Sequence, residues 1–100
     1  MNNDSIVALA TAQGISAIAV IRLSGSDCIR LVDAVFRGKR LEEQPTHTIH
    51  FGTIVDGDKV IDEVLVSIFK EPNSFTKENS VEISCHGSPL IVKEIIKVLL

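Results

Sequence analysis

The sequence lacks several features that would define its class at once. It has no Trp or Tyr and only four Phe among 100 residues, so an aliphatic core is expected. Its two cysteines, Cys28 and Cys85, are too few for a disulfide framework and predict reduced, partly buried thiols. No apolar run approaches the roughly 18 residues of a membrane span, and Asp4 stands where a secretory signal would be basic. We therefore expect a cytoplasmic protein without membrane contact.

A strong charge of one sign is also missing. The chain carries 13 acidic and 10 basic residues, and the two kinds are interspersed along it. A free-standing nucleic-acid-binding domain would show a basic stripe, so this composition argues against that class. Apolar residues make up 45% of the 100 residues, which is enough for the core of one domain and not of two.

Hydrophobic patterning predicts an α+β domain with a mixed or antiparallel sheet and two main helices. Strands are expected over residues 6–10, 17–23, 46–55, 60–69 and 81–85, which are apolar and rich in β-branched residues. The segment 17–23 is almost uninterrupted in its apolar character, which predicts a central strand covered on both faces. Turns or loops are expected over residues 12–16, 39–45, 56–59 and 70–79.

The first helix is predicted from a cap and a repeat. Ser26 is a suitable N-cap, with Asp27 in the first turn, where the helix dipole favours an anion. Apolar residues then recur at helical spacing through Phe36, and Gly38 ends the pattern.

The second helix is predicted over residues 90–100. Ser88 and Pro89 form an N-cap and first-turn pair at its start. It ends on Leu99 and Leu100 without a glycine or a polar C-cap. We therefore expect the sequence to be a piece of a longer protein.

Charged residues interrupt two of the predicted strands. The apolar residues of segment 81–85 point to one face, and Glu82 and Ser84, followed by His86, point to the other. Arg22 interrupts the apolar segment 17–23. Arg22 and Glu82 could form a buried or edge ion pair, because charges in strands are usually paired. Alternatively, both could face a pocket. A Glu carboxylate can accept two N–H bonds from a pterin or guanine edge, and an Arg suits a carbonyl, carboxylate or phosphate.

Other site chemistries find less support. No CxxC or HxxxH spacing is present, and His47 and His50 fall on opposite faces of their strand, which argues against a metal site. There is no GxxxxGK[ST] motif, and Gly87 before a helix start is by itself a weak anion site.

A hydrolase dyad is a further alternative. Ser84 and His86 lie about 7 Å apart on one face, with Glu82 as a conceivable orienting group. Catalytic triads normally converge from separate elements of the fold, so a triad on one strand is disfavoured.

Three stretches of the sequence resemble one family. They are DSIVALATAQG with IAVIRLSG, then HFGTIVDG with VIDEVLVSIFKEPNSFTKENSVEI, then CHGSP. Their order and spacing are similar to the N-terminal domain of the MnmE (TrmE) family of tRNA-modifying GTPases. The resemblance covers nearly the whole chain, and its most specific part runs from PNSFTKEN to CHGSP.

The resemblance implies that residues 1–100 form an N-terminal folate-binding and dimerisation domain, similar in fold to that of the glycine-cleavage aminomethyltransferase. It implies 5-formyl- or 5,10-methylene-tetrahydrofolate as the one-carbon donor. The family's helical and GTP-binding domains, the latter holding GTP, Mg and K, are absent from these residues. The parent homodimer and the flavoprotein MnmG (GidA) would form a heterotetramer that adds an aminomethyl or carboxymethylaminomethyl group to C5 of the wobble uridine in tRNA.

The family's folate contacts fall on Arg22 and Glu82, and a further contact would lie beyond residue 100. His86 and Gly87 match a His-Gly turn expected beside the folate. Ser88 replaces the glycine that usually follows, and the usual PPG-x-GG loop is AQGISA here, which keeps only Gly14. The resemblance implies no catalytic or metal-binding residue within the fragment. A dimerisation module without ligand, and a small Ser/His hydrolase, remain the alternatives.

Overall fold

The computed structural model describes residues 5–10, 17–72 and 78–100. Within them, six strands form one antiparallel sheet in the order β1-β2-β6-β5-β4-β3. The strands are β1 (Ile6–Leu9), β2 (Ile18–Ser24), β3 (Phe36–Arg37), β4 (Thr48–Asp56), β5 (Lys59–Phe69) and β6 (Ser80–His86). The helices are α1 (Cys28–Asp33) and α2 (Pro89–Leu99), with a 3-10 turn η1 (Leu41–Glu43). The predicted α+β class, with an antiparallel sheet and two helices, is confirmed.

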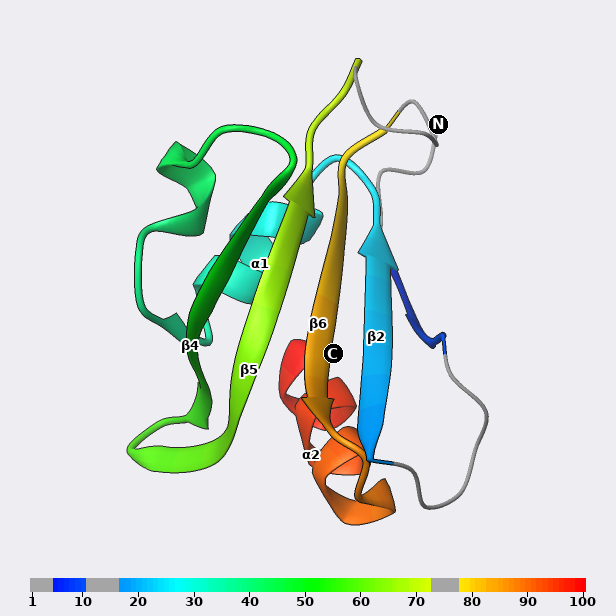
Figure 1. Ribbon diagram of the computed structural model, residues 1–100, viewed down its shortest axis with the longest axis vertical. Coiled ribbons are helices and arrows are strands. Elements are labelled where there is room, and N and C mark those ends of the chain that lie inside the picture. Colours follow the sequence, from blue (N-terminus) through cyan, green and yellow to red (C-terminus); the bar gives the residue numbers. More distant parts are fainter. Residues whose placement is uncertain (1–4, 11–16, 73–77) are drawn as a thin grey trace.

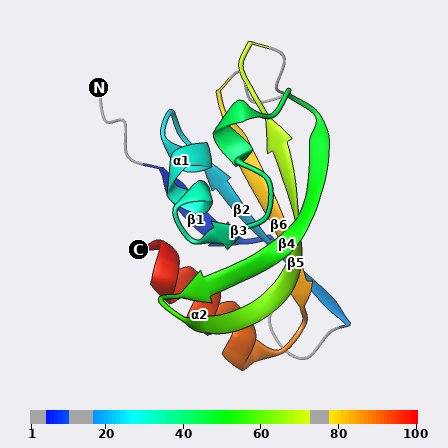
Figure 2. The same cartoon turned by 90° about the vertical axis from the view of Figure 1, so that its left-hand side faces the viewer.

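Both helices cover the same face of the sheet, as Figures 1 and 2 show. The core lies between that face and the helices and consists almost wholly of aliphatic side chains. Ile95 and Leu99 contribute to it from α2, and Cys28 and Val32 from α1. The opposite face of the sheet has no helix of the described chain over it.

The strand β6 occupies the middle of the sheet because it inserts between β2 and β5. Its register places Glu82 beside Arg22 of β2 and Ser84 beside Leu65 of β5. The alternation predicted for it is confirmed, because Val81, Ile83 and Cys85 are buried and the residues between them are not. Glu82, Ser84 and His86 therefore alternate with the buried apolar residues and lie toward the open face.

The prediction that β2 is covered on both faces is wrong. Ile21 is fully buried, whereas Ile18 on the other face is 62% exposed and Arg22 is also exposed. The reason is tertiary, because both helices pack on one face of the sheet (Figure 2), and Ile21 belongs to the core that they cover. Nothing in the local sequence could show on which face the helices would pack.

The first helix is shorter than predicted. It begins at Cys28 with Asp27, not Ser26, at the N-cap position, and it ends at Asp33. Phe36 instead begins β3 and pairs with Ile54 of β4. A cross-strand partner distant in the sequence thus overrides the local helical spacing.

The other predicted elements lie close to their observed bounds. Ser88 caps α2 by accepting a hydrogen bond from the Ile91 amide, with Pro89 in the first turn. The hairpin between β4 and β5 turns at Gly57, which has a φ of +60°. A 3-10 turn occupies part of the predicted loop 39–45. The predicted turn at 12–16, with Gly14, and part of the loop 70–79 lie outside the described residues.

Both thiols are buried and free, as predicted. Burial, with Asp27 adding to it, raises the pKa of Cys28 from 9.0 to about 12. Burial, with Asp62 adding to it, raises the pKa of Cys85 from 9.0 to about 11. The folded state thus keeps its thiols protonated at a pH where the unfolded chain loses those protons.

The free energy of unfolding should therefore fall as the pH rises from 9 toward 11. Denaturant titrations across this interval should show the decline. A Cys85→Ala variant should show a shallower decline, because one of the two linked thiols has gone. Equal slopes in the two proteins would contradict this linkage.

Candidate functional site

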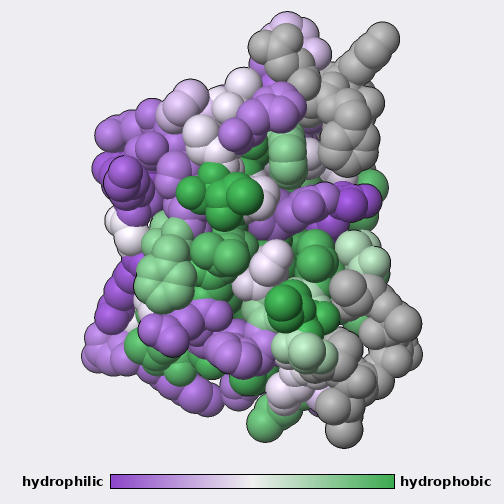
Figure 3. Space-filling model, viewed as in Figure 1, coloured by the Kyte–Doolittle hydropathy of each residue, from purple (hydrophilic) through white to green (hydrophobic). Residues whose placement is uncertain are grey.

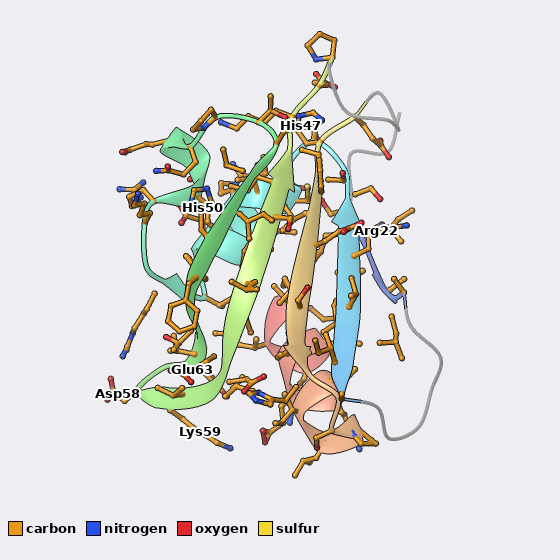
Figure 4. The ribbon with its side chains drawn as sticks, in the orientation of Figure 1. Arg22, His47, His50, Asp58, Lys59 and Glu63 are labelled. Carbon is orange, nitrogen blue, oxygen red and sulfur yellow. The ribbon has the colours of Figure 1, made fainter. Side chains whose placement is uncertain are left out.

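The open face of the sheet carries the residues that the sequence singled out. Cross-strand pairing places Arg22 and Val20 of β2 beside Glu82 and Ser84 of β6, and Ser84 beside Leu65 of β5. Hydrophobic side chains gather across the middle of this face, between hydrophilic ones (Figure 3). Arg22 lies toward one end of the face, far from Glu63 at the other (Figure 4). The face therefore has charged side chains toward both ends and an apolar centre.

Arg22 and Glu82 form an ion pair. The Nε and Nη2 groups of Arg22 donate to the same oxygen, Oε2 of Glu82, at 3.0 and 2.7 Å. The side chains are 43% and 25% exposed, so the pair is neither in the core nor fully in water. The ion pair foreseen as one alternative is present, on the open face rather than buried.

The position of this pair limits what it contributes to folding. Partly exposed ion pairs typically add about 0–1 kcal/mol of stability. The two hydrogen bonds converge on Oε2, so Oε1 of Glu82 accepts neither of them. A partly exposed carboxylate and guanidinium beside an apolar centre could therefore contact a ligand at a modest cost in stability.

A shallow hollow of about 310 Å³ lies on the same face, toward the end of β6 that carries His86. Its lining is mainly apolar and comes from four strands and the residue before β2: Ala17, Ile18, Phe51, Glu63, Val64, Leu65, Ser84, Cys85 and His86. The side chains of Ile18 and Phe51 are 62% and 65% exposed. The hollow could hold a flat apolar group, with polar atoms available at its edge.

His86 is held by a residue that the sequence analysis missed. Its Nδ1 atom lies 2.7 Å from Oδ1 of Asp62, and its backbone N–H donates to Oδ2 of the same carboxylate at 2.8 Å. Asp62 is only 8% exposed, whereas the His86 side chain is 67% exposed. A signal was available, because Asp62 shares the inward face of β5 with Val64, Val66 and Ile68, which are apolar. The sequence did not show which residue Asp62 would contact.

The structure also bears on the hydrolase, anion-binding and metal-binding alternatives. Glu82 does not orient His86 as the hydrolase alternative required, because Glu82 pairs with Arg22 and His86 with Asp62. The amide of Gly87 donates to the carbonyl of Ala17 at 3.2 Å, which occupies the N–H that an anion would need. Among residues 5–10, 17–72 and 78–100, no three His, Cys, Asp or Glu side chains are grouped as a metal site requires.

Comparison with known proteins identifies the family. The family model described as "GTP-binding protein TrmE N-terminus" matches residues 5–100. The chain belongs to this family. Its TrmE-type sequence is 55% identical over its whole length to the tRNA modification GTPase MnmE of Flavobacterium johnsoniae. It is 54% identical over 98% of its length to the MnmE of Christiangramia forsetii, and 50% identical over its whole length to that of Bacillus cereus.

The chain spans about a fifth of the length of these curated relatives, 21–22% in each case. The matched part is their TrmE N-terminal region, and the relatives are named as GTPases that act in tRNA modification. No helix in the described part of the chain is long and apolar enough to cross a membrane.

Proposed function

We propose that this chain is the folate-binding and dimerisation domain of a tRNA-modifying GTPase. The observation that carries the proposal is the pairing of Arg22 with Glu82 beside an apolar hollow on the open face of the sheet. Membership of the TrmE family supports it, because Arg22 and Glu82 are the residues expected to match the family's folate contacts. The family's similarity to the folate-binding domain of the glycine-cleavage aminomethyltransferase belongs to the same proposal.

The residues present fit a reduced folate in their chemistry. The Glu82 carboxylate offers acceptor oxygens for the N–H groups of an amino-pyrimidinone edge. The Arg22 guanidinium, which already lies against that carboxylate, can fix a carbonyl or carboxylate of the ligand while it keeps the local charge balanced. His86 and the apolar hollow lie farther along the same face. The bound folate, as a 5-formyl or 5,10-methylene form, would supply the one-carbon unit.

The larger activity requires parts that these 100 residues do not contain. The sequence has no GxxxxGK[ST] motif, so GTP, Mg and K would bind in a separate domain. Acting in the cytoplasm as a homodimer with the flavoprotein MnmG (GidA), the parent protein would add an aminomethyl or carboxymethylaminomethyl group to C5 of the wobble uridine of tRNA. The role of this domain would be to bind the donor and to join the two copies, with no catalytic residue of its own.

Glu82→Ala should weaken binding of 5-formyltetrahydrofolate to the full-length protein by about 10- to 100-fold, since hydrogen bonds to a charged group are lost. Isothermal calorimetry measures this directly. Glu43→Ala, which removes a carboxylate exposed on η1, is the matched control and should bind normally. Undiminished binding by Glu82→Ala would remove Glu82 from the site.

One observation favours a second candidate, a module that dimerises without binding ligand. Ile18, Ile49 and Phe51 are 62–65% exposed on the open face, a surface that a second protein could cover. Sedimentation showing a dimer, together with a folate titration that produces no heat, would favour this candidate. The hydrolase alternative would be dismissed by unchanged activity in Ser84→Ala.

A further inference from the structure

The buried carboxylate of Asp62 holds His86 from two directions. One oxygen contacts the ring at Nδ1 and the other accepts the backbone N–H of the same residue. Both oxygens of the Asp62 carboxylate thus form hydrogen bonds with the same histidine. The ring meanwhile stands 67% exposed at the edge of the apolar hollow.

This contact determines which ring nitrogen carries hydrogen. A carboxylate offers only acceptor oxygens, so the Nδ1 atom of His86 must be the protonated one. In the neutral ring, Nε2 is then a hydrogen-bond acceptor. The contact at Nδ1 also restricts rotation of the ring, because a rotated ring would lose its hydrogen bond to Oδ1 of Asp62.

We propose that Asp62 is a positioning residue, which sets the tautomer and orientation of His86 so that Nε2 accepts an N–H from a ligand lying in the hollow. The inference rests on the proposed function for the identity of that ligand. Ile18, Phe51 and Leu65 would contact its flat, apolar part. Glu82 and His86 are four residues apart on β6, about 13 Å, so a ligand with N–H groups at separated points could reach both.

A purely structural role makes a different demand on position 62. A structural role needs only one acceptor for the backbone N–H of His86 at the end of β6. The side-chain carbonyl oxygen of an asparagine supplies that acceptor equally well. Fixing the tautomer needs a second acceptor at Nδ1, which only the carboxylate supplies. The substitution Asp62→Asn therefore separates the two roles.

The first test is the tautomer of His86, read from the imidazole ¹⁵N shifts of the histidine-labelled chain in mildly alkaline buffer. We expect the Nδ1–H form in the native sequence. In Asp62→Asn, the amide oxygen would keep the backbone N–H and the amide group would donate to Nδ1, which shifts the ring to the Nε2–H form. Asp58→Asn, the same change at the exposed hairpin tip, should leave His86 unaltered. Retention of the Nδ1–H form in Asp62→Asn would overturn the inference.

The second test is affinity for 5-formyltetrahydrofolate in the full-length protein. Asp62→Asn and His86→Gln should each weaken binding by about tenfold, the value of one hydrogen bond. His86→Gln changes an exposed side chain, so it still gives an answer if Asp62→Asn does not fold. Normal affinity in both variants, with Glu82→Ala still impaired, would overturn the ligand contact while the proposed function stands. Absence of binding by the native protein would instead reject the proposed function, and the ¹⁵N shifts would then decide the role of Asp62.

Discussion

Ile83→Ala is expected to lower the free energy of unfolding by about 3 kcal/mol, within the range of about 2–5 kcal/mol found for large-to-small changes in cores. Ile83 is fully buried in the middle strand, opposite Ile21 of β2 and Val66 of β5. Removing its side chain leaves a cavity beneath the segment that carries Glu82 and Ser84, because neighbouring strands cannot close over it without shifting the sheet. Urea denaturation monitored by circular dichroism measures the loss.

The matched control is Ile49→Ala. Ile49 lies on the open face and is 65% exposed, so the same deletion removes little buried surface there. Its cost should stay below about 1 kcal/mol. Equal losses at the two positions would mean that Ile49 is covered in solution, which would contradict its exposure in the single chain and favour an interface on the open face.

Gly52→Ala is expected to cost about 3 kcal/mol or more, at or beyond the upper end of ordinary overpacking. A Cβ atom at Gly52 would overlap the backbone carbonyl oxygen of Arg37 and the ring of Phe36. The ring could move, but the carbonyl belongs to β3, which pairs with β4 at this point. The added methyl group would therefore separate β3 from the sheet edge. Hydrogen exchange should show lost protection in β3 alongside the fall in stability.

Gly57→Ala separates crowding from backbone strain. A Cβ at Gly57 would meet nothing within 4 Å, but its φ of +60° is unfavourable for alanine. The same substitution should therefore cost only about 1 kcal/mol at this hairpin turn. A larger loss at Gly57 than at Gly52 would contradict the assignment of crowding to Gly52.

Much of the candidate site could be predicted from β6 alone. The alternation of apolar and polar residues placed Glu82, Ser84 and His86 on one face, which the structure confirms. The charge of Arg22 in an apolar run singled out that position, and the pairing of Arg22 with Glu82, one of two alternatives, is present in the structure. The sequence could not distinguish an ion pair from two separate pocket residues, because the choice depends on whether β2 and β6 are neighbours and in which register they pair.

Asp62 shows where such prediction ends. Its inward position in β5 was visible, but its partner lies 24 residues away across the sheet. The same limit explains Phe36. Its spacing in the sequence predicts a helix, but in the structure it pairs with Ile54 and belongs to a strand. Local preferences are worth tenths of a kcal/mol per residue, and a formed ladder with buried side chains exceeds them.

Composition, local periodicity and motif order were enough to predict the α+β class, the aliphatic core, the cap of α2, the hairpin at Gly57 and the family. Contacts between distant segments were needed to establish that both helices pack on one face, that Arg22 pairs with Glu82, and that Asp62 contacts His86. Each of these joins segments distant in the chain. Their contacts exist only once the register of the sheet is set, and that register is fixed by burial of the whole apolar face rather than by any one strand.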